Sequence, residues 1–191
     1  MTTLTPAGQR LLDAASELFY TRGINAVGVE LIAETAGTTK KTLYDRFGSK
    51  DALIALYLTQ RAERWQAFVL HHLARRAPEP GTGRILAVID ALEEWMARNR
   101  RGCAFVNAHA EITDPDHPGV AAIRAEKQWM RDLYVRLARE AEISSPETVG
   151  GQVHLLHEGA IVARTVTGRL DAFDTARAAA RELLDRHTTP G

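Results

Sequence analysis

The sequence has a single cysteine, no excess of either charge and no long uncharged hydrophobic run. One cysteine, Cys103, excludes an intramolecular disulfide and indicates a reducing compartment. No stretch approaches the roughly 18 apolar residues of a membrane span, and residues 1–10 lack the apolar centre of a secretory signal, so we expect a cytoplasmic protein with no membrane partner. Because 24 basic residues balance 24 acidic ones, a uniformly basic DNA-coating protein is excluded, and any nucleic-acid site must be a local patch.

Strand-like alternation of Val, Ile and Thr is also lacking, whereas apolar residues recur at helical spacing over most of the chain. Thr5 and Pro6 are typical of a helix start, and Gly23 of a helix end. Residues 78–83 contain two prolines and two glycines and are the clearest loop. We therefore expect an all-α fold, with helices at about 6–22, 29–36, 39–47, 49–76, 84–98, 103–112, 120–142, 146–166 and 171–187.

Residues 28–47 have the pattern of a helix-turn-helix, with two short helices separated by Ala36 and Gly37. Four apolar residues are spaced to pack these helices together: Ile32, Ala33, Leu43 and Phe47. Between residues 38 and 50, four basic residues stand against one acid, Asp45, which leaves a local charge of +3 in a neutral chain. The basic residues are Lys40, Lys41, Arg46 and Lys50. A recognition helix needs this arrangement, because its first turn must reach base edges while nearby cations neutralise phosphates.

This stretch resembles the TetR family of bacterial regulators over about residues 8–60. The positions that carry the resemblance are Ala14, Ala15, Leu18, Phe19, Gly23, Ile32, Ala33, Ala36, Gly37, Thr42, Leu43, Tyr44, Phe47, Ser49, Lys50, Asp51 and Leu53. The resemblance implies a three-helix helix-turn-helix DNA-binding domain at residues 1–50 and a six-helix dimerisation and ligand-binding domain at residues 51–191. The family's own domain extends to about residue 65, through the fourth helix.

The resemblance also implies which residues contact DNA. Those expected at the major groove are Thr39, Lys40, Lys41 and Thr42, and those expected at phosphates are Tyr44 and Lys50, with Arg46 in the same basic patch. Two residues depart from the family pattern. Lys41 stands where a small residue is common, and its cation either reads guanine O6 and N7 or contacts phosphate. Asp45 either accepts from cytosine N4 or, as we favour, pairs with Lys41 four residues earlier.

One helix-turn-helix reads too few base pairs for specificity, so we expect a homodimer with recognition helices roughly 34–36 Å apart on a pseudo-palindromic operator. In the TetR family the last two helices form the dimer interface, which here implies residues 146–166 and 171–187. The apolar face expected there consists of Phe173, Ala176, Ala180, Leu183 and Leu184. The alternative is that this face belongs to the interior of the single chain.

The resemblance further implies that an unidentified small molecule binds among the helices after residue 50 and moves the fourth helix. Five residues on central helices are candidates for contacting it: Trp95, Phe105, His109, Trp129 and His157. We expect no cofactor and no metal. One alternative is a metal sensor, with ligands His154, His157 and either Glu158 or His109. The other is a redox sensor at Cys103.

An enzyme is the first competing class. The chain lacks a nucleophile elbow, a His-Glu-x-x-His motif and a phosphate loop, since the glycines at 81 and 83 follow a proline and not a strand. A helical interaction module that binds no DNA is the second, and steeply salt-dependent duplex binding would exclude it. Repression is favoured over activation, because a dimer on an operator blocks polymerase without further contacts. We therefore expect a sequence-specific DNA-binding repressor that a small molecule releases.

Overall fold

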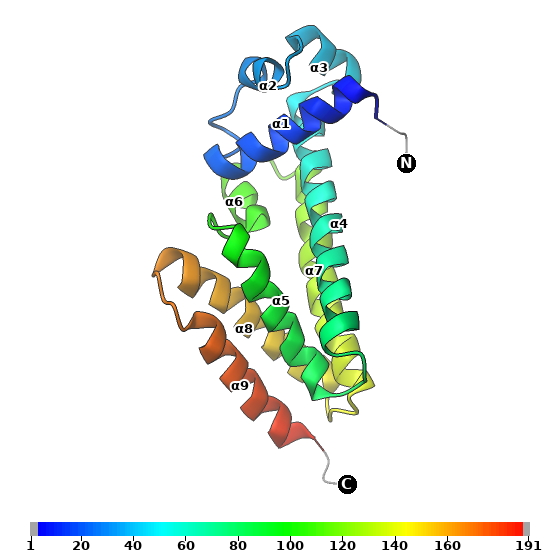
Figure 1. Ribbon diagram of the computed structural model, residues 1–191, viewed down its shortest axis with the longest axis vertical. Coiled ribbons are helices and arrows are strands. Elements are labelled where there is room, and N and C mark those ends of the chain that lie inside the picture. Colours follow the sequence, from blue (N-terminus) through cyan, green and yellow to red (C-terminus); the bar gives the residue numbers. More distant parts are fainter. Residues whose placement is uncertain (1–3, 189–191) are drawn as a thin grey trace. The chain divides into compact units, whose positions relative to one another are not determined.

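The computed structural model describes residues 4–188, which form nine helices and no strand and so confirm the all-α prediction (Figure 1). The helices are α1 (Pro6–Arg22), α2 (Val29–Thr35), α3 (Lys40–Phe47), α4 (Lys50–Arg76), α5 (Thr82–Arg98), α6 (Ala104–Glu111), α7 (Pro118–Glu140), α8 (Pro146–Val166) and α9 (Ala172–His187). Residues 1–3 of the first expected domain and residues 189–191 of the second lie outside the described part. None of the helices within it combines the length and the hydropathy that a bilayer span requires.

The helix ends follow the signals in the sequence to within about two residues. Ser49 caps α4, since its Oγ accepts a hydrogen bond from the Ala52 N–H at 3.0 Å. Helix α7 begins at Pro118 and not at about residue 120, because a proline in the first turn sacrifices no intrahelical hydrogen bond. Helix α5 begins at Thr82, inside the expected loop, because Gly81 alone makes the turn, with a φ of 146°.

The chain packs as two compact units. The described part of unit 1 is residues 4–63 and 103–125, and that of unit 2 is residues 64–102 and 126–188. The boundary falls within α4 and within α7, so both helices contribute to both units. These units describe packing, and the functional division expected at residue 50 stays a prediction.

In unit 1, α1, α2 and α3 pack against one another around one apolar core. Ile32 and Leu43 are completely buried in it, Ala33 is buried, and Phe47 is half-buried against it. The start of α4 contributes Leu53 to the same core. The four residues that the sequence assigns to helix pairing therefore have that role.

In unit 2, α9 lies against α5 and α8 (Figure 1). The apolar face of α9 is buried in this contact, through Phe173, Ala176, Ala180 and Leu184, and only Leu183 of the expected dimer face is half-buried. The assignment of that whole face to a dimer interface is therefore wrong for these four residues. The reason is that helical periodicity identifies an apolar face but not the surface that covers it.

Candidate functional site

The helix-turn-helix consists of α2, a glycine turn and α3. Gly37 makes the turn with a φ of +60°, a left-handed conformation that favours glycine. Thr39 caps α3, since its Oγ1 accepts a hydrogen bond from the Thr42 N–H at 3.2 Å. Leu43 anchors the inner face of α3 in the core, where it is fully buried. The remaining faces of the helix are free to point outward.

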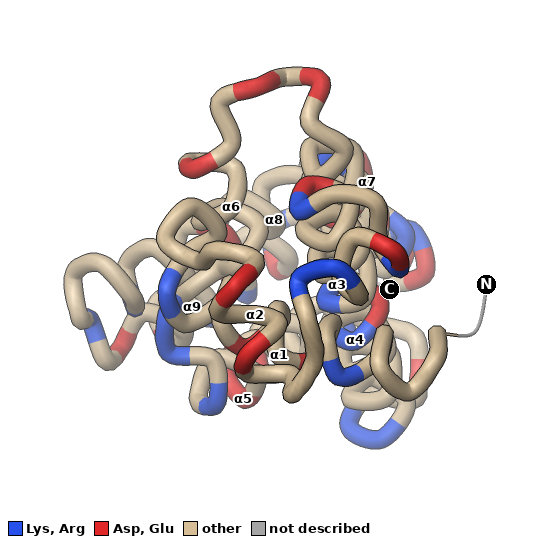
Figure 2. Tube along the Cα trace, turned by 90° about the horizontal axis from the view of Figure 1, so that it is seen from above, with Lys and Arg blue, Asp and Glu red and all other residues tan. Residues whose placement is uncertain are grey.

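The seven residues expected to contact DNA form one stretch on α3 and its flanks, and basic residues mark the segment labelled α3 in Figure 2. The exposed ones are Thr39, Lys40, Lys41, Tyr44 and Arg46, and the half-buried ones are Thr42 and Lys50. Tyr44 is 40% exposed, which excludes a role as a core aromatic. The structure thus brings these residues together, while their individual contacts with bases or phosphates stay predictions.

Two exposed ion pairs hold the lysines of α3. Lys41 Nζ donates to Asp45 Oδ2 at 2.7 Å, which confirms the pairing that we favoured for Asp45. Lys40 Nζ donates to Glu30 Oε1 of α2, and this hydrogen bond lowers the pKa of Glu30. Because exposed ion pairs contribute little free energy, both ammonium groups can exchange their carboxylate for a phosphate at small cost.

Lys50 has a second role that the sequence did not reveal. Its Nζ donates to the carbonyl oxygen of Ile24 at 2.7 Å and lies 6.0 Å from the centroid of the Phe19 ring. This contact ties the start of α4 to the loop between α1 and α2. An ammonium has three N–H donors, so the expected phosphate contact remains compatible with it.

The same loop is also tied to the end of α6. Glu111 Oε2 accepts from the Asn25 N–H at 2.8 Å, and the Glu111 carbonyl oxygen accepts from Asn25 Nδ2 at 3.0 Å. A Cβ on Gly23 would lie 2.7 Å from Glu111 Oε1, so the glycine also makes room for this carboxylate. Sequence reasoning missed Glu111 because its partner lies 86 residues away and no local pattern connects them.

The five candidate ligand-contacting residues are divided between the two units. Phe105 is buried in the core of unit 1, and His109 is exposed on α6 of the same unit. Trp129 is half-buried on α7 in unit 2. The remaining two, Trp95 and His157, also belong to unit 2. The five residues therefore do not form one site within either unit.

Trp95 and His157 meet around a residue that the sequence did not single out, Trp65 of α4. The Trp65 ring centroid lies 5.3 Å from that of Trp95 and 6.3 Å from that of His157. Trp65 is buried, and its Nε1 donates to Met130 Sδ at 3.1 Å. In the sequence, nothing distinguishes Trp65 from an ordinary core residue of a helix.

A group of polar side chains lies inside unit 2, on α7 and α8. We call it the interior polar cluster, and it consists of Glu126, Lys127, Tyr134, His154, His157 and Glu158. Lys127 Nζ donates to both carboxylate oxygens of Glu158, at 2.8 and 3.0 Å. The Tyr134 hydroxyl lies 3.0 Å from His157 Nδ1. Buried polar groups destabilise the fold unless they pair with one another or with a ligand.

Burial and neighbouring charges shift the pKa values in this cluster. It lowers the pKa of His157 to about 3, so the ring is neutral at pH 7. It raises the pKa of Glu126, against the opposing charge of Lys127. Burial would also raise the pKa of Glu158, but the approach of His154 and Lys127 outweighs it and lowers that pKa to about 2.

We expect the free energy of unfolding to fall between pH 7 and pH 5 because of His157. The unfolded chain protonates this histidine near pH 6.5, whereas the folded chain keeps it neutral down to about pH 3. The unfolded state therefore binds the proton first, and it gains stability relative to the folded state as the pH falls. For one such histidine the loss between pH 7 and pH 5 is about 2 kcal/mol, measurable by urea unfolding at both pH values.

His157→Gln isolates this effect, because glutamine does not titrate but can still hydrogen-bond Tyr134. The variant should lose less stability than the wild type between the two pH values, by that same amount. His71→Gln removes an exposed histidine from α4 and should leave the pH dependence unchanged. A His157→Gln protein with the pH dependence of the wild type would contradict the assignment.

The metal-sensor alternative depends on three ligands lying together. In residues 4–188, no three His, Cys, Asp or Glu side chains are grouped so as to hold a metal ion. The ring centroids of His154 and His157 lie 6.3 Å apart, and Glu158 is engaged by Lys127. His109, the other proposed ligand, belongs to unit 1.

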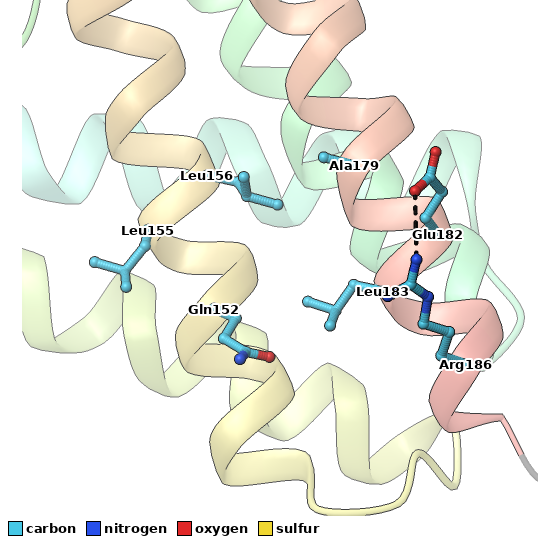
Figure 3. A pocket seen from close by; sticks show the side chains of 7 residues that line it. All are labelled: Gln152, Leu155, Leu156, Ala179, Glu182, Leu183 and Arg186. Atoms are coloured by element: carbon cyan, nitrogen blue, oxygen red, sulfur yellow. Dashed lines mark ion pairs between the residues drawn. The ribbon is translucent and has the colours of Figure 1, made fainter.

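An exposed apolar surface lies on α8 and just beyond it. Its large residues are Leu155, Val162, Val166 and Leu170, and Leu155 is 70% exposed. Beside it, α8 and α9 border a hollow of about 370 Å³ (Figure 3). The hollow is lined by Gln152, Leu155, Leu156, Ala179, Glu182, Leu183 and Arg186. The single chain therefore leaves these apolar side chains in contact with water.

Comparison with known proteins agrees with this geometry. Residues 11–56, which include the helix-turn-helix, match a family described as "Bacterial regulatory proteins, tetR family". The crystal structure of SCO4454, a TetR-family transcriptional regulator from Streptomyces coelicolor, is similar over 96% of this chain and 97% of its own, with 31% sequence identity and a TM-score of 0.87.

Two curated relatives are also similar in sequence. The HTH-type transcriptional regulator YjdC of Escherichia coli is 28% identical over 178 residues, which is 91% of each chain. The HTH-type transcriptional activator FasR of Mycolicibacterium smegmatis is 30% identical over 106 residues, which is 56% of this chain and 48% of FasR. The similarity thus includes both the helix-turn-helix and the helices that follow it.

Proposed function

Since the chain belongs to the TetR family of bacterial regulatory proteins, we propose that it is a homodimeric repressor that a small molecule releases from a pseudo-palindromic operator. Family membership makes the chain a DNA-binding transcriptional regulator and not an enzyme. The observation that carries the operator-binding part of this proposal is the exposed, basic surface of α3, anchored through Leu43 and capped by Thr39.

At the DNA, we assign the groove-facing role to the first turn of α3. Thr39 directly precedes the helix, and the helix begins with Lys40, Lys41 and Thr42. Side chains at this end of a recognition helix reach base edges. The α3 N-terminus adds favourable electrostatics for phosphate. Tyr44, Arg46 and Lys50 then take the flanking phosphates, which position the helix without reading sequence.

For dimerisation, we assign the exposed apolar surface of α8 and the hollow beside it to a second copy of the chain. Leu155 lies at the hollow and is exposed in the single chain, so a partner that covers it removes apolar area from water. A two-fold axis also matches the symmetry of a pseudo-palindromic operator, which one recognition helix cannot read alone.

For release, we assign the effector to the interior of unit 2. Helix α4 has 27 residues, which is about 40 Å at 1.5 Å per residue, and it begins at the DNA-contacting Lys50. A small tilt of such a helix displaces its DNA end by several ångströms. Full release requires that the effector prefer the DNA-incompetent state by about 5.5 kcal/mol.

The proposal is tested by fluorescence anisotropy at two salt concentrations. The protein is titrated into a duplex from the intergenic DNA upstream of its gene and into a scrambled duplex. We expect tight binding to the native duplex only, with two protomers per site and a steep salt dependence. Equal weak binding to both duplexes, without salt dependence, would remove the operator-binding role. Deletion of the gene then distinguishes repression from activation, since transcription of the neighbouring gene rises only if the protein represses it.

Thr42→Ala should reduce the preference for the native duplex over the scrambled one, by about 10-fold if its hydroxyl reads a base. The substitution leaves the Thr39 cap in place, because that cap uses the backbone N–H of residue 42. Anisotropy titrations of both duplexes measure the preference. Thr35→Ala, an exposed position on α2, is the control and should bind as the wild type does. If Thr42→Ala weakens both duplexes equally, the groove assignment is wrong.

A further inference from the structure

Glu126 of α7 is a buried carboxylate with an incomplete set of partners. It is 2% exposed, and its Oε2 accepts no hydrogen bond from any residue in the described part of the chain. Lys127 Nζ lies 3.5 Å from this oxygen, but it donates to Glu158 at 2.8 and 3.0 Å. A buried oxygen without a donor is unfavourable compared with the same group in water. Glu126 therefore has unused capacity to bind a cation or a donor.

Besides its two histidines, the interior polar cluster holds two carboxyl groups and only one lysine. The carboxylates of Glu126 and Glu158 share one ammonium, that of Lys127. His157 is neutral at pH 7, and His154, 3.4 Å from Glu158, adds a positive charge only when its ring is protonated. Burial raises the pKa of Glu126, as expected for an ionised form that lacks full compensation. A positive charge beside Glu126 would therefore compensate its carboxylate.

Aromatic rings adjoin the cluster through His157. Trp65 lies 6.3 Å from His157 and 5.3 Å from Trp95, measured between ring centroids. The Trp65 Nε1–H donates to the sulfur of Met130, and a thioether is a weak acceptor. Met130 is four residues from Glu126 on α7 and so lies one turn away on the same face. The flexible side chain of Met130 therefore contacts Trp65 and lies on the same face of α7 as Glu126.

We propose that the interior of unit 2 binds an organic cation with an aromatic or similarly flat apolar part, which pairs with Glu126 and packs against Trp65 and Trp95. This assignment rests on the proposed effector-binding function and names the chemical class of the effector. The carboxylate supplies the counter-charge, and the indole faces attract a cation more strongly than a neutral molecule of the same shape. The ligand displaces Met130, whose unbranched side chain has several rotatable bonds.

The test uses isothermal titration calorimetry of the full chain with three small probes. Phenyltrimethylammonium is the cation, tert-butylbenzene is its neutral isostere, and benzenesulfonate is the anion. We expect the cation to bind about 10-fold more tightly than the isostere and the anion not to bind. This charge selectivity is measured on the wild type and does not depend on any variant. Equal affinity for cation and isostere, or preference for the anion, would overturn the assignment.

Glu126→Gln should weaken the cation about 10-fold and leave the isostere unchanged, because it removes the charge and keeps the shape. Asp132→Asn removes an exposed carboxylate from the same helix and should bind the cation as the wild type does. Circular dichroism melting confirms that both variants are folded. Cation affinity that is unaltered in Glu126→Gln, or equally weakened in Asp132→Asn, would contradict the role of Glu126.

Operator anisotropy with and without saturating phenyltrimethylammonium separates this inference from the proposed function. Cation-selective binding that releases the duplex supports both. Cation-selective binding without release supports the site and overturns its role as the effector site. Absence of cation-selective binding, in a protein that still binds its duplex, overturns the site and leaves the DNA-binding proposal intact.

Discussion

Replacing Gly150 with alanine destabilises the protein by about 3 kcal/mol, at the upper end of what overpacking of a core costs. Helix α8 passes so close to α7 at this position that a Cβ would lie 2.7 Å from both the N and the Cα of Val135 and 3.0 Å from the carbonyl carbon of Tyr134. All three are backbone atoms of a helix, which cannot move aside as a side chain can. The whole α7–α8 contact must therefore widen, and neighbouring core side chains lose contacts.

Urea unfolding at fixed pH and protein concentration measures this effect. Gly151→Ala is the matched control, because a Cβ there meets nothing within 4 Å although the residue lies in the same helix. Alanine at residue 151 should stabilise the protein by about 0.5–1 kcal/mol, since glycine is the poorer helix former. If the two variants have the same stability, the close approach of α8 to α7 does not constrain residue 150.

Leu155→Glu converts the proposed dimer into a monomer and weakens operator binding about 100-fold, as expected when two linked recognition helices become independent. Leu155 is 70% exposed in the single chain and lines the hollow between α8 and α9, so the substitution is harmless to the isolated fold. In a dimer that covers this surface, the carboxylate would be buried without a partner, which is strongly unfavourable.

Sedimentation equilibrium and operator anisotropy provide the two measurements. The chain has a mass of 21.0 kDa, so the wild type should sediment at twice that mass and the variant at the single mass. Leu70→Glu is the control, because this residue of α4 is also an exposed leucine, at 46%, and does not line the hollow. A dimeric Leu155→Glu protein that binds its operator normally would place the dimer interface elsewhere.

The helix-turn-helix illustrates what a sequence can predict. Its turn, its pairing residues and the Lys41–Asp45 pair all depend on neighbours within a few positions, and the structure confirms each of them. Helix starts at Ser49 and at Pro118 follow from the same kind of local rule, although the latter was expected two residues later. Short-range signals of this kind depend on backbone geometry, which is nearly independent of the rest of the fold.

The functional surfaces beyond α3 illustrate the opposite case. Trp65 and Met130 are 65 residues apart, and Asn25 and Glu111 are 86 apart, so no periodicity connects either pair. In the sequence, Glu126 looks like any other charged residue of a helix, and only its burial in the fold distinguishes it from them. Two of the candidate ligand residues, Phe105 and His109, consequently belong to unit 1, whereas Trp95 belongs to unit 2.

Helical period, caps and turn residues act locally, and they were enough to predict the all-α class, the succession of helices and the basic recognition helix. The run of matched positions in the first helices predicted the family. The packing of distant segments, which no local pattern shows, buries the apolar face of α9 inside the chain, leaves an apolar surface exposed on α8 and buries the carboxylate of Glu126. The physical reason is that an apolar face or a charge has the same local signature whatever covers it. Its environment comes from distant segments, which folding alone brings to it.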